Sequence, residues 1–264
     1  MFEFGFIGTG NMATALCEAL VKSVSPRNIL LSNRTAEKAE NLAKKLGCEF
    51  GDSKSVAQKC KYIFLGVKPQ MLQSLADEIR PYLESRQERF ILISMAAGRS
   101  TENIAELFGS YPVIRIMPNV ACAVGEGVTL CAKNDLVTEV EYGEFLDAMK
   151  ESGKMDDIPE TLIDAASAVS GCGPAFVYEI IESLADGAVA CGVPRDKAYL
   201  YAAQTLLGSA KLMLETGKSP AVLKDSVCSP GGTTIQGLRK LEEGGLRSAL
   251  IEAVIASYEK ALNI

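Results

Sequence analysis

The 264-residue sequence contains no histidine. This absence excludes Ser-His and Cys-His nucleophilic pairs, histidine-ligated metals and the commonest general acid–base side chain. The eight cysteines form no Cys-x-x-Cys pair, so we expect neither a zinc site nor a small disulfide framework, and most of them should be small buried hydrophobic residues. Any chemistry must come from a cofactor or demand little proton transfer, and no metal is expected.

Basic runs and long apolar runs are also missing. The formal net charge is −6, and without a positive patch we expect no nucleic-acid partner and no membrane partner. No apolar run approaches the roughly 20 residues that cross a bilayer, and the N-terminus lacks the basic start of a signal peptide. These features predict a cytoplasmic protein. Hydrophobic residues make up 48% of the chain, which is enough for one large domain or two smaller ones.

A strand, a glycine turn and a helix are predicted at the start of the chain. Residues 2–7 form an apolar run, and apolar residues recur at helical spacing after Ala13. Between them, Gly8 and Gly10 match the dinucleotide fingerprint, because the first suits the turn and the second allows close approach of a pyrophosphate. The pattern Gly-x-Gly-x-x-Ala is weak alone, but its place directly after a strand strengthens it.

The residues after the second predicted strand bear on the choice of dinucleotide. This strand covers residues 29–32, and an acidic residue at its end would indicate NAD, but Asn33-Arg34-Thr35 stands there instead. Arg34 can pair with a 2′-phosphate, and Asn33 and Thr35 can donate hydrogen bonds, so the sequence favours NADP(H), with NAD(H) as the alternative. The plainer interpretation is an exposed turn arginine beside Thr35 as the cap of a helix through Leu46.

Three further strands alternate with helical patterns and predict an N-terminal Rossmann-like, doubly wound parallel sheet. They cover residues 62–67, 90–94 and 113–117. Ligands of such sheets bind at the carboxyl ends of the strands. With the glycine turn and the segment after the second strand, the candidate cofactor-binding residues are Ile7, Gly8, Thr9, Gly10, Asn11, Met12, Asn33, Arg34, Thr35, Val67, Lys68, Pro69, Ala96, Ala97, Gly98 and Asn119. Lys68 and Asn119 have plainer alternatives, as a solvated loop charge and a turn residue.

The pattern changes at the Asp-Asp-Ile-Pro sequence of residues 156–159, which predicts a domain boundary. We expect an NAD(P)-binding Rossmann domain over residues 1–158 and an all-α domain over residues 159–264, with helices starting near Pro174 and Pro194. Apolar and small residues run around much of these helices, and one small domain cannot easily bury them. A homodimer through the C-terminal helices is therefore expected, the alternative being a compact monomeric bundle.

Near the C-terminus, the sequence Ser-Pro-Gly-Gly-Thr-Thr at residues 229–234 precedes a segment that can be helical. The proline and glycines interrupt regular structure and leave backbone N–H groups uncovered, which suits an anion at a helix N-terminus. Thr233 and Gln236 have the spacing of a capping box, with Thr233 as the N-cap. On this stretch alone, a tight turn between helices is the simpler explanation.

Several motifs, each unspecific alone, form a specific combination. They are Phe6-Ile7-Gly8-Thr9-Gly10-Asn11-Met12, Val67-Lys68-Pro69-Gln70, Ala96-Ala97-Gly98, Arg115-Ile116-Met117-Pro118-Asn119, Val124-Gly125-Glu126-Gly127, Ser170-Gly171-Cys172-Gly173-Pro174-Ala175-Phe176 and the run from Ser229 to Val254. In this combination the sequence resembles the pyrroline-5-carboxylate reductase family over essentially the whole chain. Two departures are Cys172, where a serine is usual, and residues 120–122, where Val-Ala-Cys replaces Thr-Pro-Ala.

The resemblance implies reduction of the cyclic imine 1-pyrroline-5-carboxylate to L-proline by NAD(P)H, the last step of proline biosynthesis. It implies a helical dimerisation domain, dimers that can form larger rings, and a substrate site between the domains. The substrate carboxylate would lie on the backbone of the Gly232-Thr233-Thr234 turn, with the catalytic Thr234 hydroxyl near the ring nitrogen. Gly231 and Glu160 would be further substrate-binding residues. The missing histidine is no obstacle, because a protonated imine is already an electrophile and orientation then dominates catalysis.

Three alternatives stay open. The first is a reductase for another imine, and the second is an enzyme like the β-hydroxyacid dehydrogenases. The second would need an acid–base lysine on the long interdomain helix, and residues 173–192 contain none. The third is a catalytically silent subunit that senses NADPH and presents its helices to a partner.

Overall fold

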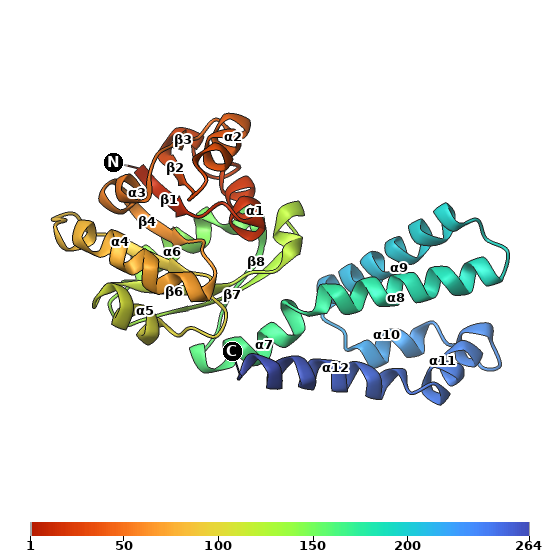
Figure 1. Ribbon diagram of the computed structural model, residues 1–264. Coiled ribbons are helices and arrows are strands. Elements are labelled where there is room, and N and C mark those ends of the chain that lie inside the picture. Colours follow the sequence, from red (N-terminus) through yellow and green to blue (C-terminus); the bar gives the residue numbers. More distant parts are fainter. Residues whose placement is uncertain (1, 264) are drawn as a thin grey trace. The chain divides into compact units, whose positions relative to one another are not determined.

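The computed structural model describes residues 2–263 (Figure 1). The chain forms two compact units, one made of residues 2–171 with residues 258–263, and the other of residues 172–257. Residues 160–170, which form two short helices, therefore belong to the same unit as the sheet. The functional boundary expected after residue 158 stays a prediction.

The first unit is built on an eight-stranded sheet in the order β3-β2-β1-β4-β5-β6-β7-β8. The strands are β1 Phe2–Ile7, β2 Ile29–Ser32, β3 Glu49–Phe50, β4 Cys60–Leu65, β5 Ile91–Ser94, β6 Val113–Met117, β7 Gly127–Lys133 and β8 Gly153–Asp157. The pairs from β3 to β6 are parallel, β7 is antiparallel to β6, and β8 is parallel to β7. The predicted Rossmann-like sheet is confirmed, with one antiparallel step.

Helices cover both faces of this sheet, as the doubly wound pattern requires. On one face, Phe4, Phe6 and Phe64 pack with residues of α1 Asn11–Leu20, α2 Ala36–Leu46 and α6 Glu139–Ala148. On the other face, Ile7 and Leu65 pack with α3 Ser53–Lys59, α4 Leu72–Glu84 and α5 Thr101–Phe108. Successive residues of β1, such as Phe6 and Ile7, therefore pack into hydrophobic clusters on opposite faces of the sheet. The Phe6 and Phe64 rings stack with centroids 4.2 Å apart.

Three features of the sheet escaped the sequence analysis. Strand β3 has only two residues, both exposed, and β8 has the polar sequence Gly-Lys-Met-Asp-Asp, so neither shows a hydrophobic pattern. Strand β7 was not among the predicted strands, and it is antiparallel to β6. The connection from β6 to β7 carries only the short 3-10 helix η3 Val120–Val124, which is too short for the crossover that a parallel pair needs.

The second unit is helical, as predicted. It contains α8 Gly173–Ala190, α9 Arg195–Thr216, α10 Pro220–Ser226, α11 Thr233–Glu243 and most of α12 Leu246–Ala261. Pro174 lies in the first turn of α8 and Pro194 is the N-cap of α9, in agreement with the expected helix starts. Its buried core is small and consists of Ala185, Ala198 and Ala202 between α8 and α9.

Many large apolar side chains of this unit are exposed on the single chain. They are Val177, Tyr178, Leu184, Tyr199, Leu200, Tyr201, Leu207, Leu212, Met213, Leu214, Val222, Val227, Ile235, Leu241, Leu246, Ile251 and Ile255. Leu214 is the most exposed of them at 82%, and so many exposed apolar side chains in one helical unit indicate an interaction surface. Among the described residues, no helix is both long and apolar enough to span a bilayer.

Four of the eight cysteines, namely Cys17, Cys60, Cys122 and Cys131, are buried. Cys172 and Cys191 are exposed, so the expectation of mostly buried cysteines holds for only half of them. Burial raises the pKa of the Cys60 and Cys131 thiols to about 12, which keeps both protonated and unreactive near neutral pH.

The start of α6 carries an ion pair between a buried carboxylate, Glu141, and a half-exposed guanidinium, Arg89. Thr138 and Glu141 form a capping box, and the guanidinium of Arg89 grips both oxygens of the Glu141 carboxylate, with Nη2 at 2.9 Å from Oε2. These contacts, Arg89 first, lower the pKa of Glu141 to about 2. Because the pKa is lower in the folded protein, the contact stabilises the fold above about pH 4.5, and this stabilisation is lost as the pH falls towards 2.

We expect Glu141→Gln to lower the thermal midpoint at pH 7 by several degrees, corresponding to about 1 to 2 kcal/mol because Arg89 is half exposed to solvent. The difference from wild type should shrink between pH 5 and about pH 2. Glu139→Gln is the matched control in the same helical turn, since the Glu139 side chain is 86% exposed. If the difference in thermal midpoint between wild type and Glu141→Gln stays constant with pH, the stabilisation assigned to the Arg89–Glu141 ion pair is contradicted.

Candidate active site

The turn after β1 is shaped by two glycines with different roles. Gly8 has φ +101°, and a Cβ placed on it would lie 2.3 Å from the carbonyl oxygen of Gly66. Its N–H donates to the Ser32 carbonyl at 2.8 Å, so the turn is anchored to β2. A Cβ on Gly10, by contrast, would meet no atom within 4 Å. The protein itself therefore requires glycine at position 8, whereas glycine at position 10 leaves open space beside the start of α1.

The N-terminus of α1 is suited to an anion. Its N-cap is Gly10, no side chain caps it, and its first turn has no acidic residue. The N–H groups of the first turn are thus uncovered, and the helix dipole favours negative charge there. The hydroxyl oxygen of Thr9 is buried and has no hydrogen-bond partner among the described residues. These properties fit the pyrophosphate of a dinucleotide.

Asn33 ties the end of β2 to the glycine turn. Its Oδ1 accepts a hydrogen bond from the Thr9 N–H at 3.1 Å, and its Nδ2 donates to the Thr35 carbonyl at 3.1 Å. Thr35 is the N-cap of α2, but its side chain makes no capping hydrogen bond. Arg34 is exposed beside them, and its guanidinium has no ion-pair partner within the part of the chain that the structure describes. Arg34 is therefore available to an anionic ligand.

The other candidate loops follow β4, β5 and β6, which lie beside β1 in that order in the sheet. The parallel strands place these loops at the same edge of the sheet as the glycine turn. The Gly66 N–H donates to the Ile7 carbonyl at 2.8 Å, and this contact joins the β1 and β4 loops. Lys68 is exposed, Ala96 is buried, and Ala97 and Gly98 are exposed at the end of β5. The sheet thus brings the predicted residues to one edge.

Asn119 follows β6, and its side chain is fully engaged within the protein. Its Oδ1 accepts from the Val128 N–H at 3.2 Å, and its Nδ2 donates to the Ser170 carbonyl at 2.9 Å. The amide therefore fastens the end of α7 Ile163–Ser170 to the loop after β6. A contribution of Asn119 to cofactor binding, which stays a prediction, would pass through its backbone.

Glu160 begins the 3-10 helix η5 Glu160–Leu162, and its carboxylate is held from several sides. Oε1 accepts from the Thr101 N–H at 2.7 Å, and Oε2 accepts from the Thr101 hydroxyl at 2.8 Å. Arg115 Nη1 lies 3.6 Å from Oε1, and Arg115 Nη2 donates to Asp164 Oδ1 at 2.6 Å. The sequence analysis did not select Arg115 or Asp164 as site residues. A charged residue inside the apolar strand Val-Ile-Arg-Ile-Met was the available signal.

In the second unit, residues 229–232 form a tight turn. The Gly232 N–H donates to the Ser229 carbonyl at 3.0 Å, Pro230 occupies the second position, and Gly231 has φ +70°, as a type II turn requires. Helix α11 then begins at Thr233 with Gly232 as its N-cap and with no capping side chain. The first turn of α11 has no acidic residue, so its N–H groups are uncovered and exposed.

The predicted capping box at Thr233 and Gln236 was therefore wrong. Thr233 is the first helical residue and Gly232 takes the N-cap position, because Gly232 ends the preceding turn in an extended conformation with φ −71° and ψ 174°. The Gln236 Oε1 instead accepts from Arg239 Nε at 3.4 Å. The anion-binding hypothesis gains from this correction, since no side-chain oxygen caps the N–H groups of the first turn.

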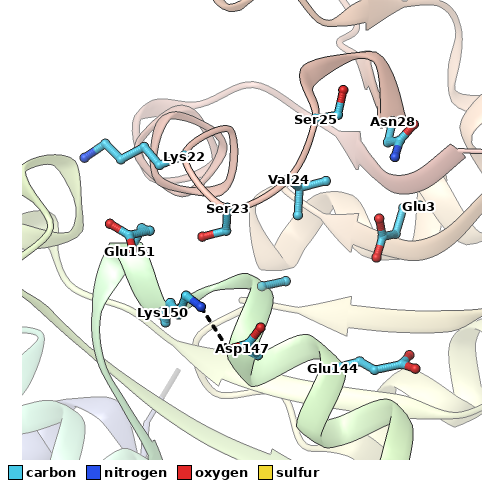
Figure 2. Close-up of a pocket in the computed structure, with 11 residues that line it drawn as sticks. Glu3, Lys22, Ser23, Val24, Ser25, Asn28, Glu144, Asp147, Lys150 and Glu151 are labelled. Atoms are coloured by element: carbon cyan, nitrogen blue, oxygen red, sulfur yellow. Dashed lines mark hydrogen bonds and ion pairs between the residues drawn. The ribbon is translucent and has the colours of Figure 1, made fainter.

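The first unit contains a cavity of about 610 Å³, whose lining residues are drawn in Figure 2. It is bounded by Glu3 near the start of β1, by the α1–β2 connection, and by Glu144, Asp147 and Lys150 at the end of α6. Lys150 and Asp147 form an ion pair across 3.1 Å within it. None of the predicted site residues lines this cavity, which is at the opposite edge of the sheet from the glycine turn.

The doubly wound sheet, the glycine turn and the uncapped α1 N-terminus define the class of this protein as a Rossmann-type dinucleotide-binding protein. Residues 3–98 match the family described as NADP oxidoreductase coenzyme F420-dependent. Residues 160–264 match the family described as Pyrroline-5-carboxylate reductase dimerisation.

Relatives that align with nearly the whole chain are named pyrroline-5-carboxylate reductases. The pyrroline-5-carboxylate reductase of Escherichia coli (strain K12) is 40% identical over 263 residues, which are 98% of this chain and 97% of that protein. Pyrroline-5-carboxylate reductase 3 of Xenopus laevis is 38% identical over 263 residues, 98% of this chain and 95% of that protein. The crystal structure of Plasmodium falciparum pyrroline carboxylate reductase with NADP bound has a TM-score of 0.87 at 30% identity, covering 99% of this chain and 97% of that one. The chain belongs to the pyrroline-5-carboxylate reductase family.

The two glycines of the turn allow a sharp test. We expect Gly8→Ala to lower the thermal midpoint by at least about 4 °C, because positive φ and the clash with Gly66 together cost about 2 kcal/mol or more. Gly10→Ala should change the midpoint by less than about 2 °C, since the position is open and only the helix cap is weakened.

The same Gly10→Ala variant should bind NADPH about tenfold more weakly by nicotinamide fluorescence, since its Cβ fills the space left for a pyrophosphate. Unchanged NADPH affinity in Gly10→Ala would remove the glycine turn from the cofactor site.

Proposed function

We propose that this chain reduces 1-pyrroline-5-carboxylate to L-proline with a reduced nicotinamide dinucleotide, as the last step of proline biosynthesis. The observation that carries the proposal is family membership over 98% of the chain. Two uncovered helix N-termini, at Gly10 and Gly232, agree with it, because the reaction needs one anion site for the cofactor phosphates and one for the substrate carboxylate. A cytoplasmic location stays a prediction.

The dinucleotide would be held at the carboxyl edge of the sheet. The N–H groups at the start of α1 would bind the pyrophosphate, and the loops after β4 and β5, with Lys68 and Ala97, would flank the nicotinamide half. The bound nicotinamide supplies a hydride to C5 of the imine ring. We propose NADP(H) as the preferred cofactor and NAD(H) as the alternative. Arg34 is exposed, has no ion-pair partner among the described residues, and can pair with the 2′-phosphate that only NADP(H) carries, whereas a carboxylate at this place would repel that phosphate.

The substrate carboxylate would lie on the turn formed by Gly231, Gly232 and Thr233. The uncovered N–H groups of the first turn of α11 can donate to it, and the helix dipole adds to the attraction. The Thr234 hydroxyl would contact the ring nitrogen in one of two ways. It would accept a hydrogen bond from the N–H of the iminium, or it would pass a proton to the neutral imine nitrogen and recover one from water. Glu160, whose carboxylate is held by Thr101, would contact the substrate near its ring nitrogen.

This chemistry does not need a histidine. The imine nitrogen can enter as its iminium, which already withdraws electrons from C5, so the protein has to orient the ring and keep the nitrogen hydrogen-bonded. Among the described residues, α8 has no lysine, and this absence leaves the hydroxyacid dehydrogenase alternative without its acid–base group.

A homodimer through the helical unit is the proposed assembly, with larger rings of dimers as an extension. The exposed apolar side chains of α8 to α12 and the match of residues 160–264 to the dimerisation family support it. Such a surface is larger than a soluble monomer usually exposes, and burying it against a second copy removes it from water. The small-molecule imine and L-proline are the other proposed partners.

The direct test follows NADPH absorbance with and without 1-pyrroline-5-carboxylate. We expect substrate-dependent oxidation, and its absence would overturn the proposed function in favour of another imine substrate or a silent NADPH-binding subunit. Thr234→Ala should lower kcat/KM for the imine by about 100-fold and leave NADPH affinity within about twofold, because only the ring nitrogen contact is lost.

Thr234→Ser should recover most of that activity, since it keeps the hydroxyl. Thr216→Ala is the matched control, because the Thr216 hydroxyl donates only to the Leu212 carbonyl of its own helix. Wild-type turnover by Thr234→Ala would remove Thr234 from the mechanism without affecting the rest of the proposal.

The choice of cofactor is tested by Arg34→Ala. We expect KM for NADPH to rise about tenfold while KM for NADH changes by less than about twofold, because only NADPH carries the 2′-phosphate. Arg27→Ala, at an exposed arginine of the α1–β2 connection, controls for a general loss of positive charge. An equal effect of Arg34→Ala on both cofactors would contradict the 2′-phosphate contact.

A further inference from the structure

Arg115 is a buried charge in the middle of the sheet. It lies on β6 beside Ser94 of β5, and its side chain is only 3% exposed. A guanidinium taken out of water is costly unless it is paired and hydrogen-bonded. Its Nε has no hydrogen-bond partner among the described residues, so the two carboxylates at its other nitrogens carry the compensation.

Both carboxylates come from the segment that leaves the sheet. Asp164 lies in the first turn of α7 and accepts from Arg115 Nη2 at 2.6 Å, and Glu160 lies in η5 with Oε1 at 3.6 Å from Nη1. Their side chains remain 31% and 27% exposed, respectively. The guanidinium therefore sits beneath two carboxylates that can still be reached from solvent.

Glu160 also binds the start of α5. The N–H and hydroxyl of Thr101 donate to its two oxygens at 2.7 and 2.8 Å. Thr101 is the first residue of α5 and comes three positions after Gly98, in the loop proposed to flank the nicotinamide. Glu160 is thus fixed between β6 and the loop after β5, at the edge of the sheet where the strands end.

We propose that Arg115 is a positioning residue for the imine reaction, which sets the place of the Glu160 carboxylate beside the nicotinamide loop while it holds the first turn of α7 through Asp164. The inference rests on the proposed function, because Glu160 acts on the substrate only if the substrate is a cationic imine. It goes further by assigning a role to a residue that touches neither substrate nor cofactor.

The shape of the side chain explains why arginine is present. Two carboxylates on separate turns are matched by two nitrogens of one rigid, planar guanidinium, since Nη2 donates to Asp164 at 2.6 Å and Nη1 lies 3.6 Å from Glu160 as an ion pair. A lysine ammonium is a single point charge and can satisfy one carboxylate fully but not both in these directions. Arg115→Lys is therefore expected to preserve charge and burial while releasing Glu160.

The test is a double-mutant cycle on the full-length protein. Arg115→Met and Glu160→Gln are each expected to raise KM for 1-pyrroline-5-carboxylate by about tenfold, with the dissociation constant for NADPH within about twofold of wild type. The double variant should be no worse than the more severe single variant, because Arg115 acts through Glu160. Arg115→Lys should fall between wild type and Arg115→Met.

Arg80→Met is the matched control, since Arg80 makes only an exposed pair with Glu84 along α4. If Arg115→Met does not fold, the cycle is run with Arg115→Lys in its place. Two results would overturn the positioning role alone. One is a double variant whose increase in KM is the product of the two single increases, and the other is a folded Arg115 variant of an active enzyme with an unchanged KM for the imine. A wild-type protein that binds NADPH but does not turn over the imine would overturn both proposals.

Discussion

The close approach of β1 and β4 is the constraint on which the cofactor edge of this protein depends. The backbones of Gly8 and Gly66 lie so near each other that a Cβ on Gly8 would be 2.3 Å from the Gly66 oxygen, and a Cβ on Gly66 would be 2.5 Å from the Gly8 oxygen. Two residues after Gly8, the N-cap of α1, Gly10, is unobstructed. The loops after β5 and β6 then reach the same edge, because parallel strands end on one side.

Charge is distributed around that edge with few buried ions. Arg115 is buried inside the sheet and compensated by Asp164 and Glu160, whereas Arg34 stays exposed and unpaired within the described residues. The first kind of cation organises the protein, because moving it would leave two carboxylates unmatched. The second kind is free to bind an anion. A histidine-free enzyme can work in this way when the substrate brings its own positive charge and the cofactor brings the electrons.

Much of the fold was predictable because its signals are local. Apolar runs of strand length, glycines after them and helical periodicity identified most of the sheet and the long helices. Strand β8 escaped because its Lys154, Asp156 and Asp157 lie at a sheet edge without an apolar pattern. The capping box at Thr233 failed because the preceding type II turn decides where the helix begins, and one residue of register separates a cap from a first turn.

The amino-acid sequence by itself determined the dinucleotide-binding class and the glycine-rich helix starts suited to anions, since each depends on residues close together in the chain, and it determined the family through a combination of such local motifs. Only the tertiary structure decided that the Asn119 amide is consumed by Val128 and Ser170. It also decided that Glu160 is shared by Thr101 and Arg115, which lie 59 and 45 positions away along the chain. Contacts across such separations arise from sheet order and helix packing, and no periodicity or spacing in the sequence encodes them.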